Sequence, residues 1–209
     1  MESAPKQTSA IEGAAKLRPA GDKYQRILDA AISVFAEKGF QAARVSDVAD
    51  RACVADGTIY LYFRNKEELL VTAVNIAFDA FMSRARSELA LIDSPAEKLR
   101  RIAQLHLEAL GSNHDLAVVF QMELRQSAHL LAPFSRQHMI EYFDLLRQAI
   151  RQGQAEGTFR PNLPDKIAAK CFFGALDEMV TAWLLDHSNY KLSEVADIAA
   201  DIILIGLQK

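Results

Sequence analysis

Apolar residues recur every three or four positions along almost the whole chain, which is the spacing of helices that bury one face. In residues 23–38, for example, Ile27, Val34 and Phe35 share such a face, and Gly39 provides a stop signal. Half of the 209 residues are apolar, which is enough for a sizeable core. The sequence therefore predicts an all-α fold of about nine helices.

Helix start signals place several of these elements. Asn65 is followed by acidic residues in the next turn, and Ser94 is followed by Pro95 and Glu97, both of which are patterns of capped helix starts. The expected helices span 23–38, 45–52, 56–63, 66–91, 95–110, 114–128, 133–156, 164–186 and 193–207.

The first 20 residues mix charges with Ala, Ser, Thr and Pro and lack the apolar stretch of a signal peptide. No apolar run reaches the roughly 18 residues of a membrane span. We expect a disordered tail over 1–20 and a cytoplasmic protein. The two cysteines, Cys53 and Cys171, are too few and too far apart to predict a disulfide framework or a metal site.

Charge alone does not predict a nucleic-acid-binding protein, because the net charge is −3. Residues 16–70 carry nine basic and eight acidic side chains, a local balance of 9 − 8 = +1. Any DNA binding must therefore depend on the geometry of a small surface.

The stretch DGTIYLYF (56–63) has the β-branched and aromatic composition of a strand. No neighbouring segment offers a strand to pair with it, and an isolated strand is unstable. In a helix capped by Asp56, Ile59 and Phe63 lie one turn apart and can pack inward. A short helix at 45–52 and a tight turn precede it, so we predict a helix-turn-helix whose second helix enters the major groove.

The outward side chains of this segment suit DNA. Thr58 and Tyr60 can donate hydrogen bonds to bases, and Leu61 can touch a thymine methyl group. Tyr62 and Lys66 suit phosphates. An ordinary surface helix with half-packed aromatics is the alternative that the residues leave open.

Residues 25–70, above all GTIYLYFRNKEELL (57–70), resemble the TetR family of bacterial transcription regulators. The resemblance implies a DNA-binding domain at 21–66 and a ligand-binding and dimerisation domain at 67–209. It also implies a homodimer that represses transcription from a palindromic operator until a small molecule releases it. The DNA-contact roles that it carries over fall on Thr58, Tyr60, Tyr62 and Lys66, with weaker claims for Arg44, Ser46 and Gly57.

Three positions depart from the family pattern. Arg44 stands where a Thr usually opens the second helix, and Ser46 replaces a usual basic residue. Cys53 occupies a turn position where the family usually has Gly. If that position needs a positive φ, cysteine costs on the order of 1 kcal/mol.

The segments 166–185 and 194–207 carry apolar residues on more than one stripe. Both sides of such helices need partners. We expect a second subunit to pack against these last two long helices, although a central place within the monomer would also explain the pattern.

The stretches FQMELRQSAHLLAPF (120–134) and FFGALDEMVTAWLL (172–185) resemble the TetR branch that controls fatty-acid degradation and binds long-chain acyl-CoA. Such a ligand needs an apolar tunnel and cations for its phosphates. The candidate ligand-binding residues are His106, Phe120, Arg125, Phe172, Phe173 and Trp183. Core packing, or an ion pair in the case of Arg125, remains the alternative for each.

Basic residues offer a second set of phosphate contacts, which solvated helix faces would explain equally well: Arg84, Arg86, Arg100, Arg101 and Arg147. An efflux repressor that responds to amphipathic drugs is the alternative function. The sequence has no catalytic motif, and its five histidines lack metal-ligand spacing, so we expect no enzyme activity, no metal and no cofactor apart from the effector.

Overall fold

The structure is a computed structural model that describes residues 20–124, 128–186 and 190–208. These residues form nine α-helices, one π-helical segment and one 3-10 turn, with a single isolated bridge and no β-strand among them. The elements are α1 (Ala20–Lys38), α2 (Val45–Ala52), α3 (Asp56–Tyr60), α4 (Lys66–Leu89), α5 (Pro95–Gly111), α6 (His114–Val118), η1 (Val119–Glu123), α8 (Ala128–Ala155), α9 (Asp165–Leu185), η2 (Leu192–Val195) and α10 (Ala196–Leu207). The all-α prediction is confirmed. The expected tail lies outside the described residues except for Ala20, which begins α1.

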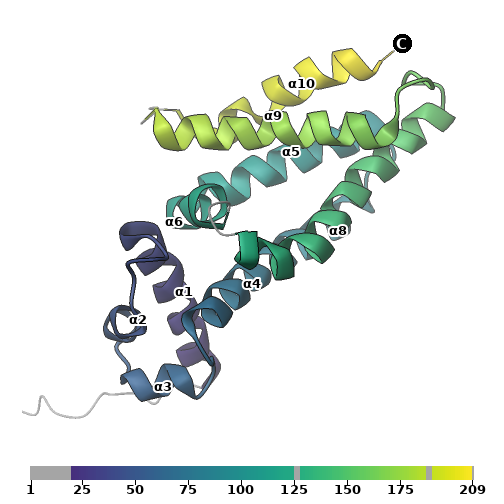
Figure 1. The fold of residues 1–209 in the computed structure, drawn as a ribbon. Helices are drawn as coiled ribbons and strands as arrows, with labels where there is room; N and C mark the ends of the chain where they lie inside the picture. Colours follow the sequence, from purple (N-terminus) through teal and green to yellow (C-terminus); the bar gives the residue numbers. More distant parts are fainter. Residues whose placement is uncertain (1–19, 125–127, 187–189, 209) are drawn as a thin grey trace, which may run out of the picture.

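The N-terminal helices α1 to α3 form a small unit at one end of the molecule (Figure 1). From this unit α4 runs into the larger part of the fold, where it packs on α5 and α8. Helices α9 and α10 lie side by side at the far end, over α5. Helix α6 packs against α1, so the two parts of the chain touch at a second place besides α4.

Capping hydrogen bonds are present at the predicted starts of α4 and α5. The Asn65 side chain accepts the N–H of Glu68 at 2.8 Å, and Ser94 Oγ accepts that of Glu97 at 3.4 Å. At Arg44, which has no capping oxygen, Asp47 of α2 reaches back and accepts the Arg44 N–H at 2.8 Å. A hydrogen bond from Lys38 and this backbone bond lower the pKa of Asp47. The departure at Arg44 is thus compensated within the same helix turn.

Helix boundaries differ most from expectation around residue 120. The predicted helix over 114–128 is α6 followed by the π-helical η1, and α8 begins at Ala128 rather than at residue 133. The expected helix over 193–207 begins with the 3-10 turn η2. π-Helical turns widen a helix locally and are frequent at functional sites, and the side chains of η1 prove to line a pocket.

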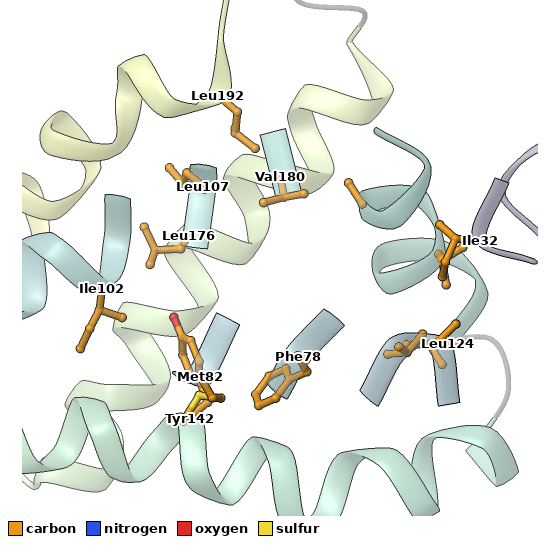
Figure 2. Packing of buried hydrophobic residues seen from close by; sticks show 14 of the residues in the cluster. Ile32, Phe78, Met82, Ile102, Leu107, Leu124, Tyr142, Leu176, Val180 and Leu192 are labelled. Carbon is orange, nitrogen blue, oxygen red and sulfur yellow. The ribbon is translucent and has the colours of Figure 1, made fainter. Parts of the chain in front are cut away.

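One continuous core joins the two parts of the molecule. Figure 2 shows Phe78 and Met82 of α4 close to Tyr142, which extends from α8 toward the helices facing it. Ile32 of α1 and Leu124, directly after η1, belong to the same cluster. The N-terminal unit and the larger part of the fold are therefore packed against each other through this core.

Cys53 has φ 53° and ψ 50°, the left-handed conformation that ends α2, and its side chain is exposed. The position therefore does need the positive φ on which the cost of a cysteine depends. We predict that Cys53→Gly raises the free energy of unfolding by about 0.5–1 kcal/mol, because glycine adopts this conformation without strain. Urea unfolding of both proteins measures the difference. Cys53→Ala is the matched control: it removes the thiol but keeps Cβ, and an equal gain there would contradict the explanation.

Candidate DNA-binding surface and ligand pocket

The helix predicted over 56–63 is present but shorter than expected. Helix α3 ends at Tyr60, and its N-cap is Ala55, so the prediction that Asp56 caps the helix is wrong. Beyond Tyr60 the chain continues as a turn, in which the N–H groups of Tyr62 and Phe63 both donate to the carbonyl of Ile59 at 2.9 Å. This turn directs Phe63 into the core and leads to the start of α4.

The division of this segment into an inner and an outer face is as the spacing predicts. Ile59 and Phe63 are 1% and 3% exposed, whereas Tyr60 and Leu61 are 57% and 81% exposed. Tyr62 is partly held, since its ring lies edge-on to that of Tyr24 with centroids 5.6 Å apart. Tyr60 and Leu61 therefore project from the surface without a packing role that would explain them.

Three weaker candidates lie in the same unit. Gly57 is exposed, and a Cβ at this position would meet no atom within 4 Å, so the backbone is open to a close approach. Thr58 and Ser46 are half-buried, and Arg44 is exposed directly before α2. Gly57 and Arg44 are therefore accessible on the surface, and Thr58 and Ser46 are partly accessible.

Lys66 has partners that the sequence did not indicate. Its ammonium donates to the carbonyls of Phe40, Gln41 and Ala43 at 2.8, 3.1 and 3.2 Å and lies 4.6 Å from the centroid of the Phe40 ring. Three acceptors use all three of its donors. Lys66 thus ties the start of α4 to the turn between α1 and α2, and a phosphate contact would have to replace one of these bonds.

A cavity of about 240 Å³ lies between α4, α5, α6, η1, α8 and α9. Most of its lining is apolar or aromatic, and the polar exceptions among the described residues are His106, Gln121, Tyr142 and Asp177. The apolar lining consists of Ala77, Phe78, Phe81, Ala109, Leu110, Leu116, Phe120, Leu124, Met139 and Phe173. An apolar site with a few convergent polar groups is typical of small-molecule pockets.

The structure brings three of the six predicted ligand residues, His106, Phe120 and Phe173, to this cavity. Phe172 does not line it: the side chain is fully buried in the core, because neighbouring positions on α9 point about 100° apart. Trp183 lines a separate hollow together with Arg84, Tyr190 and Lys191. Arg125 lies outside the described residues.

Sequence reasoning missed Gln121, Tyr142 and Asp177, which come from η1, α8 and α9. Gln121 Nε2 donates to Asp177 Oδ1 at 2.9 Å, and Thr181 Oγ1 donates to Gln121 Oε1 at 3.4 Å. Gln121 had one usable signal, an amide within an otherwise apolar run, and its burial is explained by these partners.

His106 and Tyr142 form a second polar pair, with Nδ1 and Oη 2.9 Å apart. Burial lowers the pKa of His106 from 6.5 to about 4, although the negative charge of Asp177 opposes the shift. Burial also raises the pKa of Tyr142 above its usual range. Both groups are therefore neutral near pH 7.

This burial predicts a loss of stability in mild acid. Because the unfolded chain protonates His106 below about pH 6.5 and the folded protein resists it down to about pH 4, stability falls across that window as pH decreases. We expect protonation of His106 in the unfolded chain to lower the free energy of unfolding by about 2 kcal/mol between pH 7.5 and pH 5. Urea unfolding at both pH values measures the loss. In His106→Asn, which does not titrate, the loss should be smaller by this amount, and an unchanged loss would contradict the prediction.

The basic residues considered for phosphate binding are all engaged in ion pairs. Arg84 and Arg101 share Glu88 and Glu108, and the other pairs are Arg86 with Glu141, Arg100 with Glu97 and Asp201, and Arg147 with Asp144 and Asp165. A ligand phosphate at any of them must compete with a carboxylate.

A direct hydrogen bond links the pocket wall to the N-terminal unit. Glu123 Oε2, at the end of η1, accepts the backbone N–H of Phe40 at 2.7 Å. Phe120 and Gln121 of the same π-helical turn line the cavity. The η1 segment is therefore bonded directly to the turn between α1 and α2, the same turn that Lys66 holds.

Helices α9 and α10 carry an apolar outer surface. Five large aliphatic side chains on them are exposed in the isolated chain: Ile167, Leu185, Ile198, Ile202 and Ile205. Figure 1 shows both helices on the outside of the fold. We call these five residues the α9–α10 patch. Ile198, Ile202 and Ile205 recur at three- and four-residue spacing along α10, so they lie on one face of that helix.

A helix-turn-helix unit joined through one core to an apolar pocket defines a ligand-responsive DNA-binding regulator. The chain belongs to the TetR family. Residues 27–73 match the family of bacterial regulatory proteins of the TetR type, and residues 75–206 match the C-terminal region of YsiA-like proteins.

The fatty acid metabolism regulator protein of Bacillus subtilis is 34% identical over 185 residues, covering 88% of this chain and 95% of that relative. The crystal structure of FadR from B. subtilis in complex with stearoyl-CoA is similar, with 33% identity, a TM-score of 0.83 and coverage of 88% of this chain and all of that one. The fatty acid degradation regulator FadR from Bacillus halodurans is 37% identical, with a TM-score of 0.82 and the same coverage.

These relatives are transcription regulators rather than enzymes. Within the described ranges, no helix combines the length and apolar character needed to cross a membrane. Nor do the described residues contain a cluster of three or more metal-ligating side chains.

Proposed function

We propose that this protein is a homodimeric repressor that binds a palindromic operator of fatty-acid degradation genes and is released by long-chain acyl-CoA. The observation that carries the proposal is an apolar pocket whose wall, η1, holds the α1–α2 turn through Glu123. The similarity to a regulator solved with stearoyl-CoA supports this class of effector.

The proposed DNA-binding domain is 21–66, with 67–209 as the ligand-binding and dimerisation domain. Exposure of Tyr60 and Leu61 supports base contacts by α3 and the turn after it. The full set of proposed DNA contacts is Arg44, Ser46, Gly57, Thr58, Tyr60, Leu61, Tyr62 and Lys66. Lys66 contributes mainly by holding the turn.

The α9–α10 patch supports the homodimer, because a two-fold interface buries the same surface on both subunits. Two α3 helices must then meet successive major grooves about 34–36 Å apart. A ligand that favours another separation weakens operator binding by its difference in affinity for the two states. In this mechanism the acyl chain displaces η1, and Glu123 and α4 transmit the shift to the N-terminal unit.

The aromatic side chains of Phe78, Phe81, Phe120 and Phe173 offer the acyl chain an apolar wall in the pocket. A second candidate effector has one observation in its favour. Asp177 is the one carboxylate among the described lining residues, and none of these residues is a Lys or Arg, which suits an amphipathic cation of the kind that efflux repressors bind.

Fluorescence anisotropy distinguishes the two effectors. A labelled operator, selected from random duplexes with the purified protein, is titrated with the repressor and then with stearoyl-CoA, free stearate or an amphipathic quaternary ammonium compound. We expect stearoyl-CoA to release the operator. Release by the cation alone would show that the effector is an amphipathic cation, while the proposed repressor function would stand. Failure to select any operator would overturn the repressor function itself.

A further inference from the structure

One ring nitrogen of His106 has no partner in the part of the protein that the structure describes. Nε2 is buried and makes no hydrogen bond there, whereas Nδ1 lies 2.9 Å from Tyr142 Oη. His106 and Tyr142 both line the mostly apolar cavity, so the unused nitrogen belongs to a side chain of the cavity wall. A buried polar atom without a partner is costly and needs an explanation.

The partner of Nδ1 determines what Nε2 offers. Tyr142 Oη makes its hydrogen bond to Nδ1 among the described residues. If Nδ1 carried the ring proton, the phenol proton would have no acceptor in this buried place. That tautomer would leave both the phenol proton and Nε2 without a partner within the described ranges, whereas donation by Tyr142 leaves only Nε2 without one, so we assign the ring proton of the neutral imidazole to Nε2.

The ring is also held in one orientation. The rings of Tyr142 and Phe173 meet it edge-on, with centroids 5.7 and 5.9 Å away. The nearest carboxylate in the pocket, that of Asp177, is held by the Gln121 amide. The result is a fixed, neutral N–H donor in the wall of the cavity.

We propose that the Nε2–H of His106 recognises an acceptor oxygen in the acyl part of the effector, an inference that rests on the proposed function. A hydrocarbon chain gains affinity from burial but has no group that fixes how far it enters. A hydrogen bond to one oxygen fixes how far the chain enters the pocket. It also weakens binding of chains that lack the oxygen, because the donor then stays unpaired. Every acyl-CoA carries such an oxygen in its thioester carbonyl, and an oxygen substituent on the chain itself is the second source.

The test compares ligands that differ by that oxygen. Isothermal titration calorimetry measures binding of stearoyl-CoA and of S-octadecyl-CoA, the thioether that lacks the carbonyl, together with 3-hydroxystearoyl-CoA. We expect the unmodified protein to bind stearoyl-CoA about tenfold more tightly than the thioether, the ratio that one ordinary hydrogen bond gives.

Two substitutions of His106 distinguish the effect of the N–H donor from the effect of pocket shape. His106→Asn keeps an oxygen near the position of Nδ1, where it can accept from Tyr142, but has no donor at the position of Nε2. The ratio of its affinities for stearoyl-CoA and for the thioether should therefore fall to about one. His106→Gln places an amide N–H near Nε2 and should restore part of the preference. Phe173→Leu is the control: it weakens both ligands by loss of packing and leaves their ratio unchanged.

The outcomes separate the inference from the function on which it rests. A preference for 3-hydroxystearoyl-CoA over stearoyl-CoA that disappears in His106→Asn supports recognition of a chain oxygen instead of the thioester. Ratios that are the same in His106→Asn and the unmodified protein overturn the role of His106, while acyl-CoA binding itself stands. Failure of all three ligands to bind any variant overturns the acyl-CoA effector and the inference together.

Discussion

The Ile202→Asp variant should be monomeric, and its affinity for a palindromic operator should fall by about 10²–10⁴-fold, the gain that joining two binding sites gives. Ile202 is 68% exposed in the isolated chain and lies in the α9–α10 patch. In a two-fold interface the substitution buries a carboxylate from each subunit without a partner, which is strongly unfavourable. Analytical ultracentrifugation measures the oligomeric state, and anisotropy measures operator binding.

Ile140→Asp is the matched control for this prediction. Ile140 is also an exposed isoleucine, at 51%, but it lies on α8 outside the patch. It should leave dimerisation and operator affinity unchanged. If both variants remain dimers with normal operator binding, the patch does not form the subunit interface.

Ile59→Ala should lower the free energy of unfolding by about 2–4 kcal/mol, because it removes buried methyl groups from the core beneath α3. Ile59 is 1% exposed and belongs to the core cluster with Val34 and Val48. Urea unfolding at pH 7.5 measures the loss. A loss below about 0.5 kcal/mol would mean that α3 does not depend on this contact.

Tyr60→Ala, on the exposed face of α3, is the variant matched to Ile59→Ala. Since Tyr60 is 57% exposed, we expect stability to change little, while specific operator binding weakens by about 1–3 kcal/mol if the phenol contacts a base. Equal weakening on a scrambled duplex would assign Tyr60 to the phosphate backbone instead.

Spacing along the chain was sufficient to predict α1, α2 and the two-faced segment around Ile59, because each depends on neighbours within a few turns. Caps at Asn65 and Ser94 were predictable for the same reason. The end of α3 at Tyr60 was not, since it depends on how Phe63 turns into a core built by distant helices. The extra partners of Lys66, more than 20 residues away, were equally beyond local reasoning.

The pocket shows the same limit. Phe172 and Phe173 are indistinguishable in sequence, because α9 is apolar on several sides, and only the packing of neighbouring helices assigns one to the core and the other to the cavity. The arginines considered for phosphates find acids on other helices, as Arg86 does with Glu141 and Arg100 with Asp201.

Local patterns were enough to predict the helical class, the helix-turn-helix with its buried Ile59 and exposed Tyr60, and the resemblance to the TetR family, because periodicity, caps and turns act over a few residues. The folded arrangement was needed to show that His106 contacts Tyr142, that Gln121 contacts Asp177 and that η1 reaches Phe40 through Glu123. Those contacts join residues 36 to 83 positions apart, and their partners are selected by the packing of whole helices rather than by any local pattern.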